Sequence, residues 1–257
     1  MIQVLTADVS PLLDESLFND QLSKLSSVRQ EKALAYRFPK GRALSLGVGL
    51  LCDEYLSRLN TCEKDSGFSY DEFGKPYFAR LPHIKFSLSH SGIFVAAAFS
   101  DAGEVGIDIE KIKPVTSTKL DVAKRCFSEA DNRALLALTG SEQTALFFRL
   151  WTELESLFKY NSSHTLNLSP QEEGRSASVF HSCDIDDYAL TVCANANDAV
   201  IHRRIFFPLN PARETPENVS FLRNNTLIKL NNNKKQATEL VDHFREVTKM
   251  VGMKHNQ

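Results

Sequence analysis

The stretch Val105-Gly106-Ile107-Asp108-Ile109-Glu110 places two carboxylates at alternate positions among apolar, β-branched residues. In a strand, successive side chains point to opposite faces, so Asp108 and Glu110 are predicted on one face and the isoleucines on the other. Two like charges so close are unfavourable unless a cation lies between them, and oxygen ligands without nearby His or Cys suit Mg²⁺ or Mn²⁺. The hexapeptide alone favours the alternative, an edge strand with a solvated acidic face.

Around this strand, the hydrophobic periodicity predicts an α+β protein. Strands are expected at 2–7, 68–78 (with a turn), 84–88, 93–100, 104–110, 177–183, 188–194 and 201–207. Helices are expected within 12–59, broken at Pro39 and Gly41, then at 119–127, from a Ser128 cap to 138, and from Ser141 onward as the longest helix. The alternation of strands and helices indicates two similar halves, residues 1–102 and 103–207.

Residues 208–257 form a third segment with a different character. Prolines and asparagine runs predict a loose connector, and Leu240, Val241, Phe244, Val247 and Val251 are spaced as one apolar face of a terminal helix. That helix is expected either to pack on the body or to dock a partner or a second copy.

Composition excludes several classes of function. The chain has 257 residues, is 42% hydrophobic and carries a net charge of -2, so no global field attracts nucleic acid or an acidic membrane. Five cysteines without CxxC spacing argue against a structural zinc site or a disulfide framework. The N-terminus lacks signal-peptide features, and no apolar run approaches the ~20 residues that cross a bilayer, so a cytoplasmic location is expected.

Four further groups could carry chemistry, although each has a simpler reading. Glu155 and Lys159 share a helix face and could be only a surface ion pair. The run from Ser87 to Gly92 offers three hydroxyls and an imidazole to phosphate oxygens; a Ser–His nucleophile pair is disfavoured because adjacent strand residues point apart. Gly74-Lys75-Pro76 presents one cation on a turn. A basic group, normally a solvated face, comprises Arg29, Lys32, Arg37, Lys40 and Arg42.

Together and in this order, these residues resemble the surfactin-type (Sfp-like) 4′-phosphopantetheinyl transferases. Four motifs carry the resemblance: Phe73-Gly74-Lys75-Pro76, Phe86-Ser87-Leu88-Ser89-His90-Ser91-Gly92, Gly106-Ile107-Asp108-Ile109-Glu110, and the segment Trp151-Thr152-Glu153-Leu154-Glu155-Ser156-Leu157-Phe158-Lys159. Arg125-Cys126-Phe127-Ser128 resembles the family's link between the halves. The resemblance runs from about Arg29 to Ala194.

This resemblance implies a pseudo-twofold, monomeric α+β enzyme that binds coenzyme A between its halves. It would transfer phosphopantetheine to a serine of an apo-acyl or peptidyl carrier protein and release 3′,5′-ADP, as a holo-[acyl-carrier-protein] synthase does. The pathway, whether fatty acid, polyketide or nonribosomal peptide synthesis, is left open. The implied metal ligands for Mg²⁺, or Mn²⁺, are Asp108, Glu110 and Glu155.

The remaining implied roles concern coenzyme A. Glu155, or a metal-bound water beside it, would be the base, and Lys159 would bind the pyrophosphate with Ser89 and His90 as further donors. Lys75 and Pro76 would flank the adenine. The 3′-phosphate would be held by Arg42, His90, Lys32 and Arg29.

The chain departs from the family pattern at two places. Leu154 stands where a lysine is usual, and the common Gly-Lys-Gly-Leu run after the helix is replaced by residues 160–166. Leu154 shares a helix face with Trp151 and Phe158, so we expect it to pack between the halves. These departures leave open a second function, a degenerate homologue that binds coenzyme A or a carrier protein without transfer.

Overall fold

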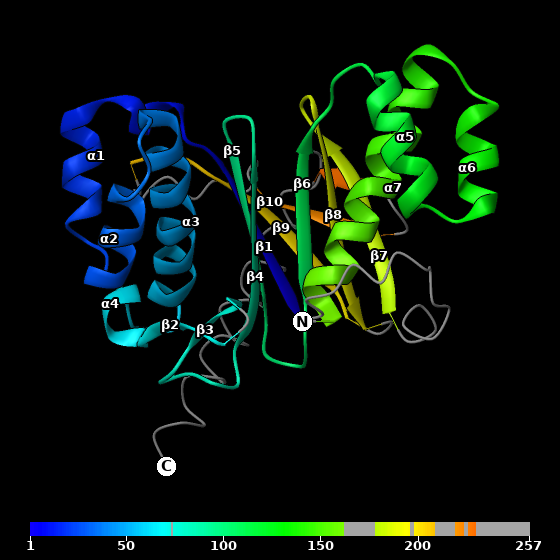
Figure 1. The fold of residues 1–257 in the computed structure, drawn as a ribbon. Helices are drawn as coiled ribbons and strands as arrows, with labels where there is room; N and C mark the ends of the chain where they lie inside the picture. The colour runs from blue at the N-terminus through cyan, green and yellow to red at the C-terminus, as the bar shows by residue number, and fades with distance from the viewer. Residues whose placement is uncertain (73, 162–177, 196–197, 209–218, 224–225, 230–257) are drawn as a thin grey trace.

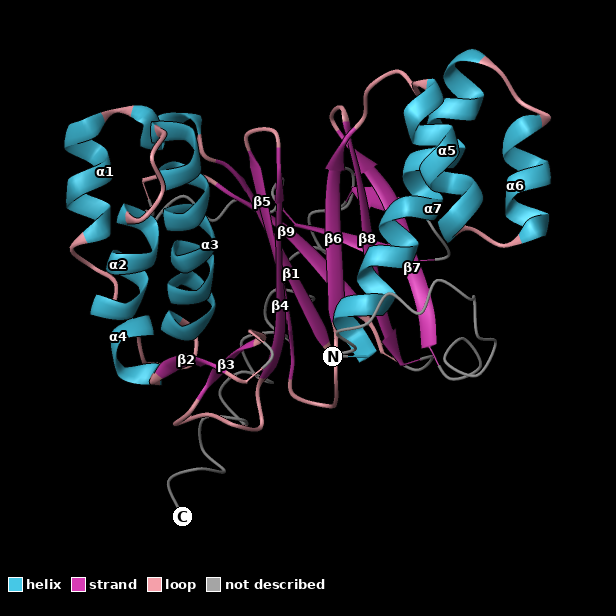
Figure 2. Cartoon of the chain, viewed as in Figure 1, coloured by secondary structure: helices cyan, strands magenta, loops and turns pink. Residues whose placement is uncertain are grey.

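The computed structural model of the chain describes all residues except 73, 162–177, 196–197, 209–218, 224–225 and 230–257. Figure 1 shows two β-sheets in the middle of the molecule, with one group of helices on each side. The layer order is therefore helices, sheet, sheet, helices (Figure 2). The α+β class is confirmed.

The larger sheet has the strand order β11-β10-β9-β1-β5-β4. These strands are β1 (Ile2–Asp8), β4 (Lys85–Ser91), β5 (Phe94–Ser100), β9 (Val200–Ile205), β10 (Val219–Arg223) and β11 (Thr226–Lys229). The central strand β1 runs antiparallel to β5 and parallel to β9. Because β9 pairs with β1, a segment late in the sequence completes the sheet that the N-terminus begins.

The second sheet has the order β6-β8-β7, from β6 (Gly106–Lys111), β8 (Tyr188–Asn195) and β7 (Ser178–Ile185). It packs against the larger sheet through an apolar core that includes Ile2, Val4, Ile107 and Ile109, all fully buried. A short hairpin of β2 (Phe68–Tyr70) and β3 (Pro76–Phe78) lies beside the first group of helices.

Helices cover the outer face of each sheet. The first group contains the 3₁₀ helix η1 (Ser10–Leu13) with α1 (Glu15–Leu22), α2 (Ser27–Leu34), α3 (Pro39–Ser57) and α4 (Glu63–Ser66). The second group contains α5 (Ser117–Cys126), α6 (Glu129–Leu136) and α7 (Gly140–Asn161). The predicted cap of α6 is confirmed, because the Ser128 hydroxyl accepts a hydrogen bond from the Asp131 N–H at 3.1 Å.

The segment after Pro208, predicted as a loose connector, contains two strands. Strands β10 and β11 pair with each other, and β10 extends the larger sheet beyond β9. Periodicity missed both because each has only four or five residues and is flanked by asparagines or prolines. The predicted terminal helix lies outside the described residues. The two-half division and its pseudo-twofold relation stay predictions.

Candidate active site

The acidic strand β6 has the predicted alternation. Ile107 and Ile109 are buried in the core between the sheets, while Asp108 leaves the opposite face toward α7. The Asp108 side chain is only 6% exposed. Its Oδ1 accepts hydrogen bonds from Lys159 Nζ at 2.7 Å and from the Ser89 hydroxyl at 2.8 Å. Its buried Oδ2 has no hydrogen-bond partner among the described residues.

The absence of a side chain at Gly106 lets α7 approach β6 closely. A Cβ atom at Gly106 would lie 1.9 Å from the Ser156 carbonyl oxygen and 2.6 Å from the Tyr160 N. The Thr152 hydroxyl also contacts the Thr191 hydroxyl of β8, 2.7 Å away. These contacts hold α7 against the second sheet and place Lys159 over Asp108.

A row of serines joins the two sheets where β4 and β6 run side by side (Figure 2). The hydroxyls of Ser87, Ser89 and Ser91 accept hydrogen bonds from the backbone N–H groups of Ile107, Ile109 and Lys111, at 3.1 to 3.3 Å. The three serines alternate along β4 and point toward β6, so His90 between Ser89 and Ser91 points to the other face. This agrees with the argument against a Ser–His nucleophile pair. Ser89 also receives a hydrogen bond from Lys159 Nζ at 3.0 Å, so its donor and both acceptor positions are used.

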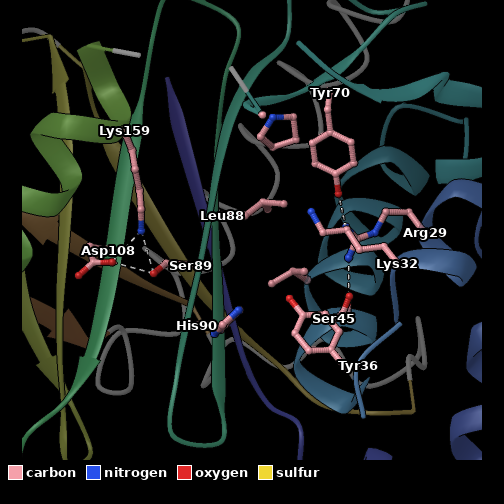
Figure 3. A pocket seen from close by; sticks show the side chains of 13 residues that line it. Arg29, Lys32, Tyr36, Ser45, Tyr70, Leu88, Ser89, His90, Asp108 and Lys159 are labelled. Carbon is pink, nitrogen blue, oxygen red and sulfur yellow. Dashed lines mark hydrogen bonds and ion pairs between the residues drawn. The ribbon is translucent and has the colours of Figure 1, made fainter. Parts of the chain in front are cut away.

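A cavity of about 350 Å³ lies between this row and the first group of helices. Figure 3 shows Asp108, Ser89 and Lys159 on one side, Lys32, Tyr36 and Tyr70 on the other, and Leu88 and His90 between them. The sequence-predicted residues that line the cavity are Arg29, Lys32, Pro76, Ser89, His90, Asp108 and Lys159. Residues from distant parts of the chain therefore meet at this cavity.

Four predicted residues are not among those that line the cavity: Arg42, Lys75, Glu110 and Glu155. Arg42 Nε donates to the carbonyl of Tyr36, which does line it, at 2.8 Å. Lys75 Nζ forms an ion pair with Glu104 at 2.6 Å. The Glu110 carboxylate accepts a hydrogen bond from the Ser91 hydroxyl at 2.7 Å.

Arg29 is held by protein groups although it lines the cavity. It is 2% exposed, and it donates to the Tyr70 hydroxyl at 2.9 Å and to the Ser45 carbonyl. These bonds tie α2 to α3 and β2, so the guanidinium supports the wall that carries Lys32. The sequence pattern does not separate an arginine that is buried for structural reasons from one that binds an anion, because both are cationic residues on a helix.

The environment shifts the pKa values of three predicted site residues. Burial raises the pKa of Glu155, and the nearby Asp108 charge raises it further, while Lys159 opposes the shift. Burial also raises the pKa of Glu110, against the lowering effect of the Ser91 hydrogen bond. The His90 pKa is lowered, first by partial desolvation in the cavity wall and then by the Lys159 charge, although its ring is accessible to solvent.

The donor chemistry fits a divalent cation in part. The buried Oδ2 of Asp108, which no group in the described part of the chain bonds, is an oxygen that a hard cation would satisfy, and Glu110 and Glu155 add only oxygen ligands. In the described arrangement, however, no three His, Cys, Asp or Glu side chains are grouped as metal ligands, and Lys159 supplies the positive charge at Asp108.

Leu154 does not lie where the sequence predicted. It packs against the apolar cluster of α5, α6 and α7, which includes Phe127, Leu135 and Phe147, and not between the two halves. The expectation was wrong because the face shared by Trp151 and Leu154 turns toward the helices that follow β6, an arrangement that helical spacing alone does not specify.

Sequence reasoning also missed two aromatic residues of the cavity, Tyr36 and Tyr70. The Tyr70 ring lies 4.0 Å from Lys32 Nζ. Tyr36 lies in the short loop between α2 and α3, two residues before Phe38-Pro39. That position was the available signal, since loops between helices often contribute to binding sites.

Comparisons with known proteins relate the chain to one family of transferases. Residues 104–196 match the family model of the 4′-phosphopantetheinyl transferase superfamily. The 4′-phosphopantetheinyl transferase AcpT of Salmonella typhimurium is 33% identical over 67% of this chain and 88% of its own length. The 4′-phosphopantetheinyl transferase Sfp of Bacillus subtilis is 38% identical over 54% of this chain, and the match spans 60% of the length of that relative.

Proposed function

The chain belongs to the 4′-phosphopantetheinyl transferase superfamily, and from this premise we propose that it transfers phosphopantetheine from coenzyme A to a carrier-protein serine. The serine oxygen would form a bond to the β-phosphorus of coenzyme A, and the bond to 3′,5′-ADP would break. Phosphopantetheinyl transferase is the activity that the names of the relatives share. An acyl or peptidyl carrier protein is the acceptor class that we propose.

One observation carries the proposal. The cavity places the carboxylate of Asp108, whose Oδ2 has no hydrogen-bond partner among the described residues, beside the ammonium of Lys159; Lys32 lies on the opposite side and His90 lies between them. A pyrophosphate needs several positive groups for its oxygens, and a phosphoryl transfer needs them around the reacting phosphorus. The cavity lining offers the ammonium groups of Lys159 and Lys32 for these oxygens, in a protein with almost no net charge.

The site residues would divide the reaction between them. Lys159 would leave Asp108 to neutralise a pyrophosphate oxygen, and Glu155 would accept the serine proton. Asp108, Glu110 and Glu155 would hold Mg²⁺ or Mn²⁺, which when bound supplies Lewis-acid stabilisation of the pyrophosphate charge.

The other end of coenzyme A would lie along the first group of helices. Lys32 and His90 line the cavity and would bind the 3′-phosphate, with Arg42 at the rim and Arg29 supporting the wall. Pro76 would flank the adenine, and Lys75 would do so only after its ion pair with Glu104 breaks.

The holo-[acyl-carrier-protein] synthase subtype is part of the proposal, as are the monomeric state and the cytoplasmic location. Over the described residues, no helix is both long and apolar enough to cross a membrane.

The test is incubation with coenzyme A, Mg²⁺ and several apo-carrier proteins, followed by intact-mass measurement. We expect a phosphopantetheine adduct on at least one carrier protein, loss of the adduct with EDTA, and loss with Asp108→Ala. Asp187→Ala is the matched control, because it removes a carboxylate that pairs with Lys111 on the surface. Binding of coenzyme A without any adduct would instead identify the degenerate binding homologue.

A further inference from the structure

The three serines that join β4 to β6 make different sets of hydrogen bonds. Each hydroxyl accepts one backbone N–H of β6, and for Ser87 this is the only hydrogen bond among the described residues. Ser91 accepts the Lys111 N–H at 3.1 Å and also donates to Glu110 Oε2 at 2.7 Å. Ser91 therefore connects the backbone of one sheet with an acidic side chain of the site.

We propose that Ser91 is a positioning residue that orients the Glu110 carboxylate for divalent-cation binding. A serine hydroxyl has one proton, and the Lys111 N–H fixes the oxygen, so the proton can be directed to Glu110 while both bonds stay short. The inference deepens the proposed function and rests on Glu110 being a metal ligand there.

Glu110 requires such an anchor more than Asp108 does. Its side chain has one more rotatable bond, it is only partly buried, and the charge of Asp108 disfavours a nearby carboxylate. Asp108 is held by both Lys159 and Ser89, whereas the Ser91 hydroxyl is the one hydrogen-bond donor to the Glu110 carboxylate within the described part of the chain. Partners that orient metal ligands commonly contribute about 10- to 100-fold to metal affinity or activity.

The position of Ser91 argues against direct binding of coenzyme A. Ser89 lines the cavity, but Ser91 is not among the lining residues, and its proton is already donated to Glu110. Its effect on the reaction would therefore act through Glu110. A purely structural role, joining the sheets, would instead be shared with Ser87.

The experiment compares Ser91→Ala, Ser91→Thr and Ser87→Ala in the full chain. Calorimetric titration with Mn²⁺ in the presence of coenzyme A measures cation affinity, and transfer assays give kcat and the KM for coenzyme A. We expect Ser91→Ala to weaken Mn²⁺ binding and lower kcat by about tenfold or more, with little change in KM. Ser91→Thr keeps the hydroxyl and should restore both, while Ser87→Ala should lower the unfolding midpoint but leave Mn²⁺ affinity unchanged.

Two results with the variants would overturn the proposed role of Ser91 while leaving phosphopantetheine transfer intact. One is a transferring wild type whose Mn²⁺ affinity does not change with Ser91→Ala. The other is an equal loss of affinity in Ser87→Ala, which would assign the effect to the junction between the sheets. A wild type that transfers phosphopantetheine but binds no Mn²⁺ would also overturn the role of Ser91, and a wild type without transfer or Mn²⁺ binding would overturn both proposals.

Discussion

Gly106→Ala tests whether the close approach of α7 to β6 positions Lys159 over Asp108. The new Cβ would lie 1.9 Å from the Ser156 carbonyl oxygen, whereas such contacts essentially never fall below 3.0 Å. The backbone of the helix cannot rotate away as a side chain can, so α7 has to shift by about 1 Å, the difference between these distances. The same shift would lengthen the 2.7 Å contact between Lys159 Nζ and Asp108 Oδ1 beyond hydrogen-bond range.

Two magnitudes follow from this shift. Forcing extra atoms into a packed interior lowers the free energy of unfolding by about 1–3 kcal/mol. A displacement of about 1 Å in a catalytic group lowers turnover by about 100-fold. We therefore expect Gly106→Ala to fold, to lose about 2 kcal/mol in guanidinium unfolding, and to transfer phosphopantetheine about 100-fold more slowly.

Ile107→Val is the matched control for this experiment. It removes one methyl group from the neighbouring residue, on the face of β6 that points away from α7, and should cost about 1 kcal/mol without affecting transfer. Unchanged stability and turnover in Gly106→Ala would refute the packing argument. An equal loss of turnover in Ile107→Val would attribute the defect to general destabilisation.

Local patterns in the sequence predicted the parts of the site that lie within one element. The alternation in β6 identified the faces of Asp108 and Ile107, because in a strand the side-chain period is fixed by the backbone. Helical spacing likewise placed Glu155 and Lys159 one turn apart on α7. These inferences required no knowledge of neighbouring elements.

Contacts between elements were not predictable in the same way. The Ser91 bond to Glu110 joins two sheets, and the ion pair of Lys75 with Glu104 joins a turn to a loop, so neither has a periodic signal. Leu154 was misplaced for a related reason: spacing defines which residues share a helix face but not what that face contacts. The parallel pairing of β9 with β1 depends on a connection that runs from Asp8 to Val200.

Three further predictions concern residues away from the β6 to α7 contact. Leu154→Lys should change turnover by less than about tenfold, or ~1.4 kcal/mol in the barrier, because Leu154 packs in the helical cluster; an inactive wild type awakened by this change would refute it. Lys32→Ala should lower the affinity for coenzyme A by about tenfold or more in calorimetry, since one charge-assisted contact to the 3′-phosphate is lost. The affinity for 3′-dephospho-coenzyme A should change little, and an equal loss for both ligands would show that Lys32 does not bind the 3′-phosphate. His202, fully buried beside the Thr6 hydroxyl at 2.8 Å, has its pKa lowered to about 4 by desolvation. The unfolded chain takes up this proton near the usual pKa of 6.5 and the folded chain only near 4, so the His202 contribution is fully present above pH 6.5 and falls as pH drops toward 4. The loss amounts to about 3 kcal/mol. Urea unfolding at several pH values should therefore show a steeper acid loss in the wild type than in His202→Gln, and parallel curves would show that His202 does not titrate in this way.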